Sequence, residues 1–589
     1  MKHTLTAGLA ALITATTVWG AEPKSPTPTP ATTRAVRPQD LGLEFLKNAK
    51  FGIFVHYTRS TPYAFGKPNP AVWDLDAQAA AFDVKAFADA VEDMGAQYVT
   101  MTAFHAAMYL MGPSKVMSDI GMPTHQAKRD MLGDIADELN KRGIALCLYV
   151  HPVDQHDLSR EERALFGWGP EVDGLPGPRL GLWPNPKWDD FILGLFKEMS
   201  LRYGERVSGY WIDRHSPKRF EHAERMAAAL RAGNPDAVIW QSGPDYVQDG
   251  LSLEDAWPAA ESGYTDRGEK DQCCIMPTGD WMQGTEVKIP AAEVLRAVAR
   301  CAGCPGQKGG IHISLTPFAT GYPPKVKDLM AEFGRLWRER KVSLLNTTPS
   351  KIIEPVHNIP WEVVATDSAD GSTVYVHAMI PPDGQTLHLP PLNDSRKIIS
   401  ASLLLGGKEV KFKQSEEAVD LSLPEDVKWD PVDTVIVLKV GPAFEPGVLL
   451  SENATLEISS TCAHDVAANH ARLFSGERVE YAFHTAPEKN PWAKIDLGAV
   501  RTVRTVEIEN RQGEEQRTKG LVMSISEDGQ KWQEVWQAKS WVTTWIVRLI
   551  QPSADAGNPG RKARFIKLET RGESPRPLVL KRVTVFGVK

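Results

Sequence analysis

The chain has little excess charge, few cysteines and almost no long apolar segment. Its formal net charge is −7 over 589 residues, which gives no sign of a nucleic acid or an anionic membrane surface as a partner. Beyond the N-terminal segment, no run is long and apolar enough to cross a bilayer. The remaining composition is that of a soluble globular protein, and the length predicts roughly three or four domains.

The six cysteines do not show the spacing of a zinc finger. The vicinal pair Cys273-Cys274 and the pair Cys301 and Cys304 are able either to form disulfides between neighbouring loops or to remain free thiols. A four-thiolate zinc site is the less favoured alternative because one pair is vicinal. No metal is therefore assigned.

The first residues resemble an export signal. Lys2 and His3 precede an apolar run over 5–19, and small residues precede Ala21. We predict a signal peptide over 1–20 and a Pro/Thr-rich linker over 21–37, and hence a periplasmic or extracellular protein. A short membrane anchor is the alternative, but the run is short for a span.

From residue 38 to residue 348, short apolar runs alternate with amphipathic stretches. This alternation predicts a parallel sheet covered by helices, and its length suits a (β/α)8 barrel. An open doubly wound sheet is the alternative, which the absence of a Gly-rich phosphate loop after the first strand weakens. The predicted strands are 51–56, 96–102, 144–150, 207–213, 237–241 and 310–315, and the predicted helices are 83–95, 124–142, 187–203, 221–232, 291–301 and 323–338.

The helical periodicity disappears after about residue 350. Short β-branched runs such as 372–380 and 434–440 are separated by Pro, Asp and Gly, which predicts a β-sandwich over 349–445. A second all-β block follows over 446–589.

Four predicted barrel strands end in polar side chains. The apolar strand Tyr210–Ile212 ends in Asp213, and His56, His105 and His151 stand at the ends of three others. The C-terminal ends of barrel strands carry catalytic groups, so we expect these four side chains to converge. Asp213 as a simple turn cap, and each histidine as a buried structural residue, are the alternatives.

The barrel motifs resemble glycoside hydrolase family 29, the α-L-fucosidases. The strand from Phe51 to Tyr57 is similar to the family's opening strand, which carries a sugar-binding histidine at the position of His56. Tyr98–His105 resembles its Lys-His-His-Asp-Gly-Phe strand, and Tyr210–Asp213 resembles its Trp-Phe-Asp-Gly, whose Asp is the nucleophile. Gly309–Pro317 and the helix after it resemble a late family segment.

Several positions depart from the family pattern. Phe104 replaces a Lys, Ala106 and Ala107 replace a His and an Asp, Ser314 replaces an Asn, and Arg214 replaces the Gly after the nucleophile. One sugar-binding histidine is thus missing, which leaves open a sugar other than plain fucose.

The resemblance implies a retaining mechanism, in which two carboxylates about 5 Å apart act as nucleophile and acid/base. Asp213 takes the first role. Gln241–Asp245 resembles a segment of one fucosidase subgroup that precedes its acid/base, which selects Glu254, with Glu261 as runner-up. His56, His105 and His151 would bind sugar hydroxyls, and Tyr57 and Trp211 would line the pocket.

The C-terminal block resembles a discoidin, or coagulation factor 5/8 type C, domain. The similar segments are Asn490–Gly498, Val522–Trp532 and Ala563–Lys567, together with the end of the chain. The resemblance implies a carbohydrate-binding module in which a structural calcium is possible. Trp492 and Trp532 are interpreted as core residues.

The sequence as a whole predicts an exported retaining exo-glycosidase that removes terminal α-L-fucosyl or related residues from a glycan or polysaccharide without a cofactor. One alternative is a diverged retaining glycosidase for another or a sulfated sugar. The other is a catalytically weakened glycan-binding protein.

Overall fold

The structure is a computed structural model that describes most residues from 49 to 588. The gaps are 60–65, 67–73, 106, 153–157, 170–184, 214–219, 243–249, 254–271, 304–309, 354–361, 393, 395, 416–417, 443–445, 475–480, 512–513, 540–541, 543 and 550–559. The predicted signal peptide and linker, over 1–37, lie outside these described residues.

Eight parallel strands close into a barrel, in the order β1 to β8. The last strand pairs with the first through Phe51 and Ile311, so the barrel prediction is confirmed and the open sheet is wrong. Strands β6 and β7 are short segments that the sequence patterns did not reveal. The strands are β1 Phe51–Val55, β2 Tyr98–Phe104, β3 Ala145–Val150, β4 Gly209–Ile212, β5 Val238–Ser242, β6 Gly250–Leu253, β7 Gln272–Ile275 and β8 Ile311–Ser314.

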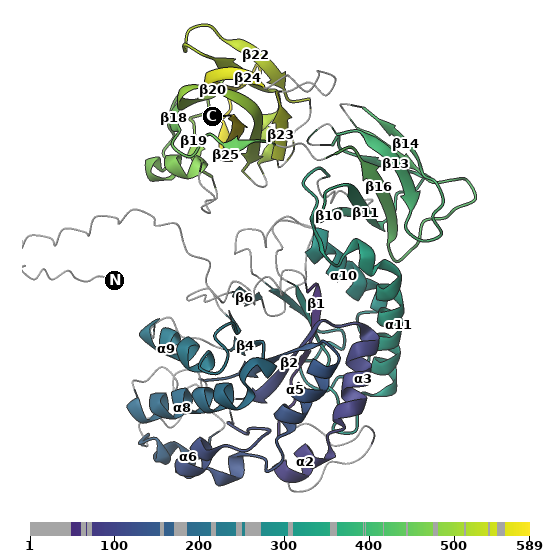
Figure 1. Ribbon diagram of the computed structural model, residues 1–589, viewed down its shortest axis with the longest axis vertical. Coiled ribbons are helices and arrows are strands. Elements are labelled where there is room, and N and C mark those ends of the chain that lie inside the picture. The colour runs from purple at the N-terminus through teal and green to yellow at the C-terminus, as the bar shows by residue number, and fades with distance from the viewer. Residues whose placement is uncertain are drawn as a thin grey trace, which may run out of the picture. The chain divides into compact units, whose positions relative to one another are not determined.

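The barrel strands are covered by helices, as Figure 1 shows for α3, α5, α8 and α11. Helix α3 begins after Asp83, whose side chain accepts from the Ala86 amide, and ends at Gly95 in the left-handed region, as its sequence predicts. The helices are α2 Leu75–Ala81, α3 Val84–Met94, α4 Lys115–Asp119, α5 Met131–Lys141, α6 Arg160–Leu165, α8 Pro186–Tyr203, α9 Phe220–Leu230, α10 Ala291–Gly303 and α11 Pro324–Arg340.

The predicted helix over 124–142 is too long at its N-terminal end. Helix α5 begins only after Asp130, whose carboxylate accepts from the Gly133 amide and caps it. The residues before Asp130 include the short 3-10 helix Pro123–His125. The helix therefore starts at this N-cap, although the apolar periodicity of the sequence begins before it.

The barrel interior is filled by layers of side chains. One layer contains Tyr98, Cys147 and Trp240, and a second contains Phe54, Tyr149, Trp211 and Cys274. A Cβ on Gly52 would lie 2.2 Å from the Tyr98 ring, so only glycine leaves room for this ring beside β1. The interior is thus a packed support for the groups at the strand ends.

Two antiparallel sheets follow the barrel, which agrees with the predicted sandwich. One has the order β13-β16-β11-β10-β9 and the other the order β12-β15-β14. Arg300 of α10 donates two hydrogen bonds, of 2.6 and 2.7 Å, to the carboxylate of Glu362 on β10. The strands are β9 Thr347–Pro349, β10 Glu362–Ser368, β11 Thr373–Ile380, β12 Thr386–Leu389, β13 Ile398–Leu403, β14 Lys411–Gln414, β15 Val419–Ser422 and β16 Thr434–Val440.

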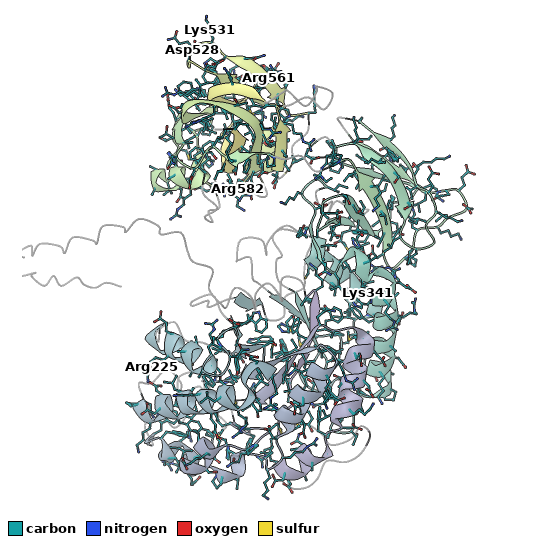
Figure 2. All side chains as sticks on the ribbon, in the orientation of Figure 1. Arg225, Lys341, Asp528, Lys531, Arg561 and Arg582 are labelled. Carbon is teal, nitrogen blue, oxygen red and sulfur yellow. The ribbon has the colours of Figure 1, made fainter. Side chains whose placement is uncertain are left out.

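The C-terminal part has nine strands in one sheet system around its own apolar core. Its Ser-Glu-Asp-Gly motif forms a turn in which Oδ1 of Asp528 accepts from the amides of Gln530 and Lys531, each at 2.8 Å. Figure 2 shows Asp528 and Lys531 at the surface. The strands are β17 Val448–Leu449, β18 Thr455–Ile458, β19 Phe483–His484, β20 Trp492–Asn510, β21 Leu521–Ser526, β22 Gln533–Gln537, β23 Thr544–Arg548, β24 Arg561–Thr570 and β25 Val579–Val588.

The interpretation of Trp492 and Trp532 as core residues is wrong. Both side chains are half-buried and lie outside the apolar core cluster, and their rings instead face lysines. The Nζ atoms of Lys494 and Lys567 each lie 6.0 Å from the centroid of the respective ring. Trp545 is the indole in the core cluster of this region. Strand alternation places Trp492 on the face opposite Ala493 and Ile495.

Among the described residues, no helix combines the length and the apolar character that a membrane span requires. The side chains of Cys274 and Cys301 are buried, and neither takes part in a disulfide. The side chains of Cys273 and Cys304 lie outside the described part of the chain.

Candidate active site

The predicted convergence of strand ends occurs. His56 follows β1, His105 follows β2, His151 follows β3 and Asp213 follows β4, all at the C-terminal mouth of the barrel. The ring centroids of His56 and His105 are 4.8 Å apart, and those of His105 and His151 are 4.6 Å apart. His151 and Asp213 are almost completely buried. The three imidazoles and the carboxylate therefore form one cluster.

A β-bulge aims His105 into this cluster. Along β2 the even-numbered residues face the interior of the barrel. Thr100 is one of them, and its hydroxyl oxygen lies 2.9 Å from Nε2 of His312. The pairing with β3 then shifts register between Thr102 and Phe104. After the shift Phe104 packs outward, with its ring centroid 6.3 Å from that of Phe196 in α8, and His105 turns inward.

Asp213 is held by two neighbours, Tyr149 on β3 and His151 directly after this strand. The Tyr149 hydroxyl donates a hydrogen bond to Oδ2 of Asp213, and Nε2 of His151 lies 3.4 Å from the same oxygen. The Asp213 amide donates to the Val150 carbonyl at 2.9 Å, which fixes the backbone at the end of β4. Hydrogen bonds to a carboxylate favour its ionised form, as a nucleophile requires.

Burial lowers the pKa of His56 to about 4, and the neighbouring His151 adds to the decrease, while the charges of Asp213 and Asp280 oppose it. His56 is therefore a neutral imidazole at neutral pH. Its amide donates to the Thr316 hydroxyl at 2.7 Å, and its buried Nδ1 has no hydrogen-bond partner within the described part of the chain. A neutral ring with an unused nitrogen suits a hydroxyl-rich ligand.

Asp280 and Trp281 belong to the loop after β7 and reach this mouth. The Trp281 ring packs edge-on against Phe54 with centroids 5.5 Å apart, and its carbonyl accepts from the Thr316 hydroxyl at 3.1 Å. Asp280 is exposed and influences His56 electrostatically. It is thus a second carboxylate on the same side of the barrel as Asp213.

Two predicted pocket residues lie deeper than expected. Trp211 is buried under the cluster, with its ring centroid 4.7 Å from that of Phe54 and 5.0 Å from that of His312, so it forms the floor. Tyr57 lies in the main core, where its ring packs on Phe82 and its hydroxyl donates to the Gln78 carbonyl at 3.4 Å. The structure does not bring Tyr57 together with the histidines.

Glu254 and Glu261, the predicted acid/base and its runner-up, lie outside the described residues, as do Arg214 and Ala106. The backbone of β6 is described, and it ends at Leu253. In the sequence, Glu254 follows the last described residue of β6.

Sequence reasoning missed Tyr149 and Asp280. The signal for Tyr149 was available, because Cys147, Tyr149 and His151 alternate on β3 and share its inner face. Asp280 gave no comparable signal, because the seventh strand before it was not recognised.

His105, His151 and Asp213 also form a group in which one ligand atom from each lies within 4.8 Å of the others. Two imidazoles and a carboxylate suit a divalent transition metal by ligand chemistry. The prediction of no metal remains a prediction.

A closed parallel barrel with ionisable groups at its C-terminal mouth defines the class of TIM-barrel enzymes. Residues 73–242 match the α-L-fucosidase family model, and residues 457–581 match the F5/8 type C domain. The segment over residues 73–242 is therefore similar to the α-L-fucosidases, which are glycoside hydrolases.

Several solved structures that this chain resembles in fold are fucosidases. An α-L-fucosidase isoenzyme 1 from Paenibacillus thiaminolyticus is 19% identical, with a TM-score of 0.53 over 69% of this chain and 100% of that one. A family 29 α-L-fucosidase from Bacteroides thetaiotaomicron, described as a trapped covalent intermediate with 2-fluoro-fucosyl fluoride, is 19% identical, with a TM-score of 0.54 over 69% of this chain and 98% of that one.

A curated relative from Caenorhabditis elegans, named as a candidate α-L-fucosidase, is 20% identical over 427 residues, which are 64% of this chain and 80% of that protein. At these identities the structural likeness establishes a shared fold.

Proposed function

We propose that this protein is an exported retaining exo-glycosidase that hydrolyses terminal α-L-fucosyl or closely related residues from glycans. The observation that carries the proposal is Asp213 at the end of β4, hydrogen-bonded by Tyr149 and adjacent to His151 and the other imidazoles. The trapped covalent intermediate of the Bacteroides relative supports the double-displacement mechanism.

In this mechanism Asp213 attacks the anomeric carbon while the glycosidic bond breaks and the acid/base protonates the leaving oxygen. The same acid/base then deprotonates a water molecule, which hydrolyses the glycosyl-enzyme ester and releases Asp213. Tyr149 aims the carboxylate and stabilises its charge before the attack. His56 and His105, whose rings lie side by side, would bind hydroxyls of the sugar, and Trp211 supports them from below.

The acid/base must be a second carboxylate facing Asp213. Glu254 is supported by the sequence, in which it follows Leu253 of β6 and the fucosidase-like segment Gln241–Asp245, and Glu261 remains the runner-up. Asp280 is a third candidate, since its charge acts on His56 from the loop after β7. Export and a calcium ion in the C-terminal domain remain part of the proposal, on the sequence arguments alone.

Hydrolysis of a panel of aryl glycosides by the full chain tests the proposal. Aryl α-L-fucoside should be cleaved with retention at the anomeric carbon, and Asp213→Asn should lose several orders of magnitude in kcat. 2-Fluoro-fucosyl fluoride should label the peptide that contains Asp213, which mass spectrometry detects. No cleavage of any glycoside and no labelling would overturn the proposal and favour a glycan-binding protein.

The acid/base is assigned by substituting Glu254, Glu261 and Asp280 separately with the matching amide. Loss of the acid should slow the hydrolysis of aryl fucosides with poor leaving groups far more than that of fucosides with activated leaving groups. Added azide should restore turnover, with glycosyl azide as the product. A variant that loses activity equally on both substrates does not lack the acid/base.

A further inference from the structure

Arg59 and Tyr109 connect the two loops that follow His56 and His105. Nη1 of Arg59 donates to the Tyr109 hydroxyl at 2.9 Å, and the guanidinium carbon lies 4.4 Å from the centroid of the ring. Arg59 follows His56 by three residues, so their Cα atoms are at most about 11 Å apart. The pair therefore lies beside the imidazole cluster.

A tight turn brings Tyr109 to this place. The Met108 amide donates to the His105 carbonyl at 2.7 Å, and Met108 has a φ of 59°, a left-handed value that a non-glycine residue seldom adopts. Its side chain is completely buried, which holds the backbone in this conformation. The turn thus positions Tyr109 at the edge of the site.

The Tyr109 ring has a rigid support of its own. It stacks on the imidazole of His125 at a centroid distance of 4.1 Å and an interplanar angle of 14°. Nδ1 of His125 donates to the Ala107 carbonyl at 3.0 Å, and Nε2 lies 2.7 Å from the Glu162 carboxylate. Arg59, Tyr109, His125 and Glu162 form a column built from the loops after β1, β2 and β3.

Arg59 differs from other arginines of the barrel domain in its charge balance. Arg129 and Arg142 each form ion pairs with acidic side chains, whereas Arg59 has no carboxylate within ion-pair distance among the residues that the structure describes. The residue is half-buried, so it is not sealed off from solvent. Its planar fork is ordered on the tyrosine ring and retains donors for an oxyanion.

We propose that Arg59, held by the Tyr109–His125 column, is a subsite for an anionic substituent of the glycan, a sulfate ester or a carboxylate. The inference rests on the proposed function, because it takes the sugar to be bound at His56 and His105. It names an acidic glycan as the substrate class. A neutral fucoside would leave the guanidinium without a counter-charge.

Calorimetric titration of the full chain carrying Asp213→Asn tests this subsite without hydrolysis. The probes are methyl α-L-fucoside, its 2-, 3- and 4-monosulfates, methyl α-D-galactoside and methyl α-D-galacturonide. At least one anionic probe should bind roughly ten- to a hundredfold more tightly than its neutral parent, because a charge-assisted hydrogen bond is gained. The preference should weaken at high ionic strength.

Arg59→Met in this background should abolish the preference, and Arg59→Lys should retain part of it. Tyr109→Phe preserves the ring and removes the hydroxyl that accepts from Arg59, so it should reduce the preference partly and tests the subsite if Arg59→Met proves unstable. Arg335→Met makes the same chemical change on the exposed surface of α11 and should leave the preference unchanged.

Equal binding of charged and neutral probes overturns the subsite, as does a preference that survives Arg59→Met. Neither result affects the hydrolysis of aryl fucosides, so failure of the subsite is separate from failure of the proposed function. The sulfate and uronate probes distinguish the two sources of the anion.

Discussion

The hydroxyl of Tyr149 on β3 donates a hydrogen bond to Oδ2 of Asp213 at the end of the adjacent strand β4. The two residues are brought together by the parallel pairing of these strands, in which Tyr149 is opposite Trp211, two residues before Asp213. The tyrosine both orients the carboxylate and stabilises its negative charge.

Replacing Tyr149 by Phe should therefore impair catalysis and leave the fold intact. The loss of a hydrogen bond to a charged group predicts a roughly ten- to hundredfold decrease in kcat. The acidic limb of the pH profile should also move to higher pH, since the ionised carboxylate is less stabilised. An unchanged kcat and pH profile would show that the bond has no role in the reaction.

Added Zn²⁺ should inhibit the enzyme, because His105, His151 and Asp213 offer ligand atoms within 4.8 Å of one another. We expect inhibition that is competitive with an aryl fucoside and reversed by EDTA. EDTA alone should not lower the activity of the untreated enzyme, and a loss of activity on chelation would contradict the assignment of no catalytic metal. His151→Asn should weaken the inhibition.

The folded protein should lose stability as the pH falls below 6.5. Burial lowers the pKa of His312 to about 3, and His56 has a pKa of about 4, against 6.5 for an exposed histidine. Below pH 6.5 these histidines are protonated in the unfolded chain but remain neutral in the folded chain. The free energy of unfolding therefore falls as the pH decreases, until about pH 3.

The contribution of His312 is on the order of a few kcal/mol. Between pH 7 and pH 4, the free energy of unfolding measured with urea should therefore change less with pH in His312→Gln than in the wild type. His388 is exposed in the sandwich, so His388→Gln should follow the wild type. Parallel pH dependences of wild type and His312→Gln would refute the neutral buried imidazole.

The buried ion pair between Arg300 and Glu362 predicts a large effect of removing one partner. Glu362→Gln leaves the guanidinium without its counter-charge and should reduce the free energy of unfolding by about 3–5 kcal/mol. Asp426→Asn breaks an exposed pair with Lys408 and should cost at most about 1 kcal/mol. Urea unfolding measures both, and equal effects would contradict the difference in burial.

The sequence by itself determined the class of fold and most of the site. Strand and helix periods predicted the barrel, because each element must bury one face whatever its neighbours are. Asp213 was recognisable as a carboxylate at the end of an apolar strand, and His56 and His151 by the same rule.

Only the tertiary structure decided the orientation of individual side chains. The bulge before Phe104 turns His105 inward, and a register shift depends on the pairing between β2 and β3, which no local pattern records. Tyr57 follows His56 directly but faces α2, since successive residues leave a strand on opposite sides. The Tyr149–Asp213 bond and the Arg59 column join different strands and loops, and their partners become neighbours only when the barrel closes.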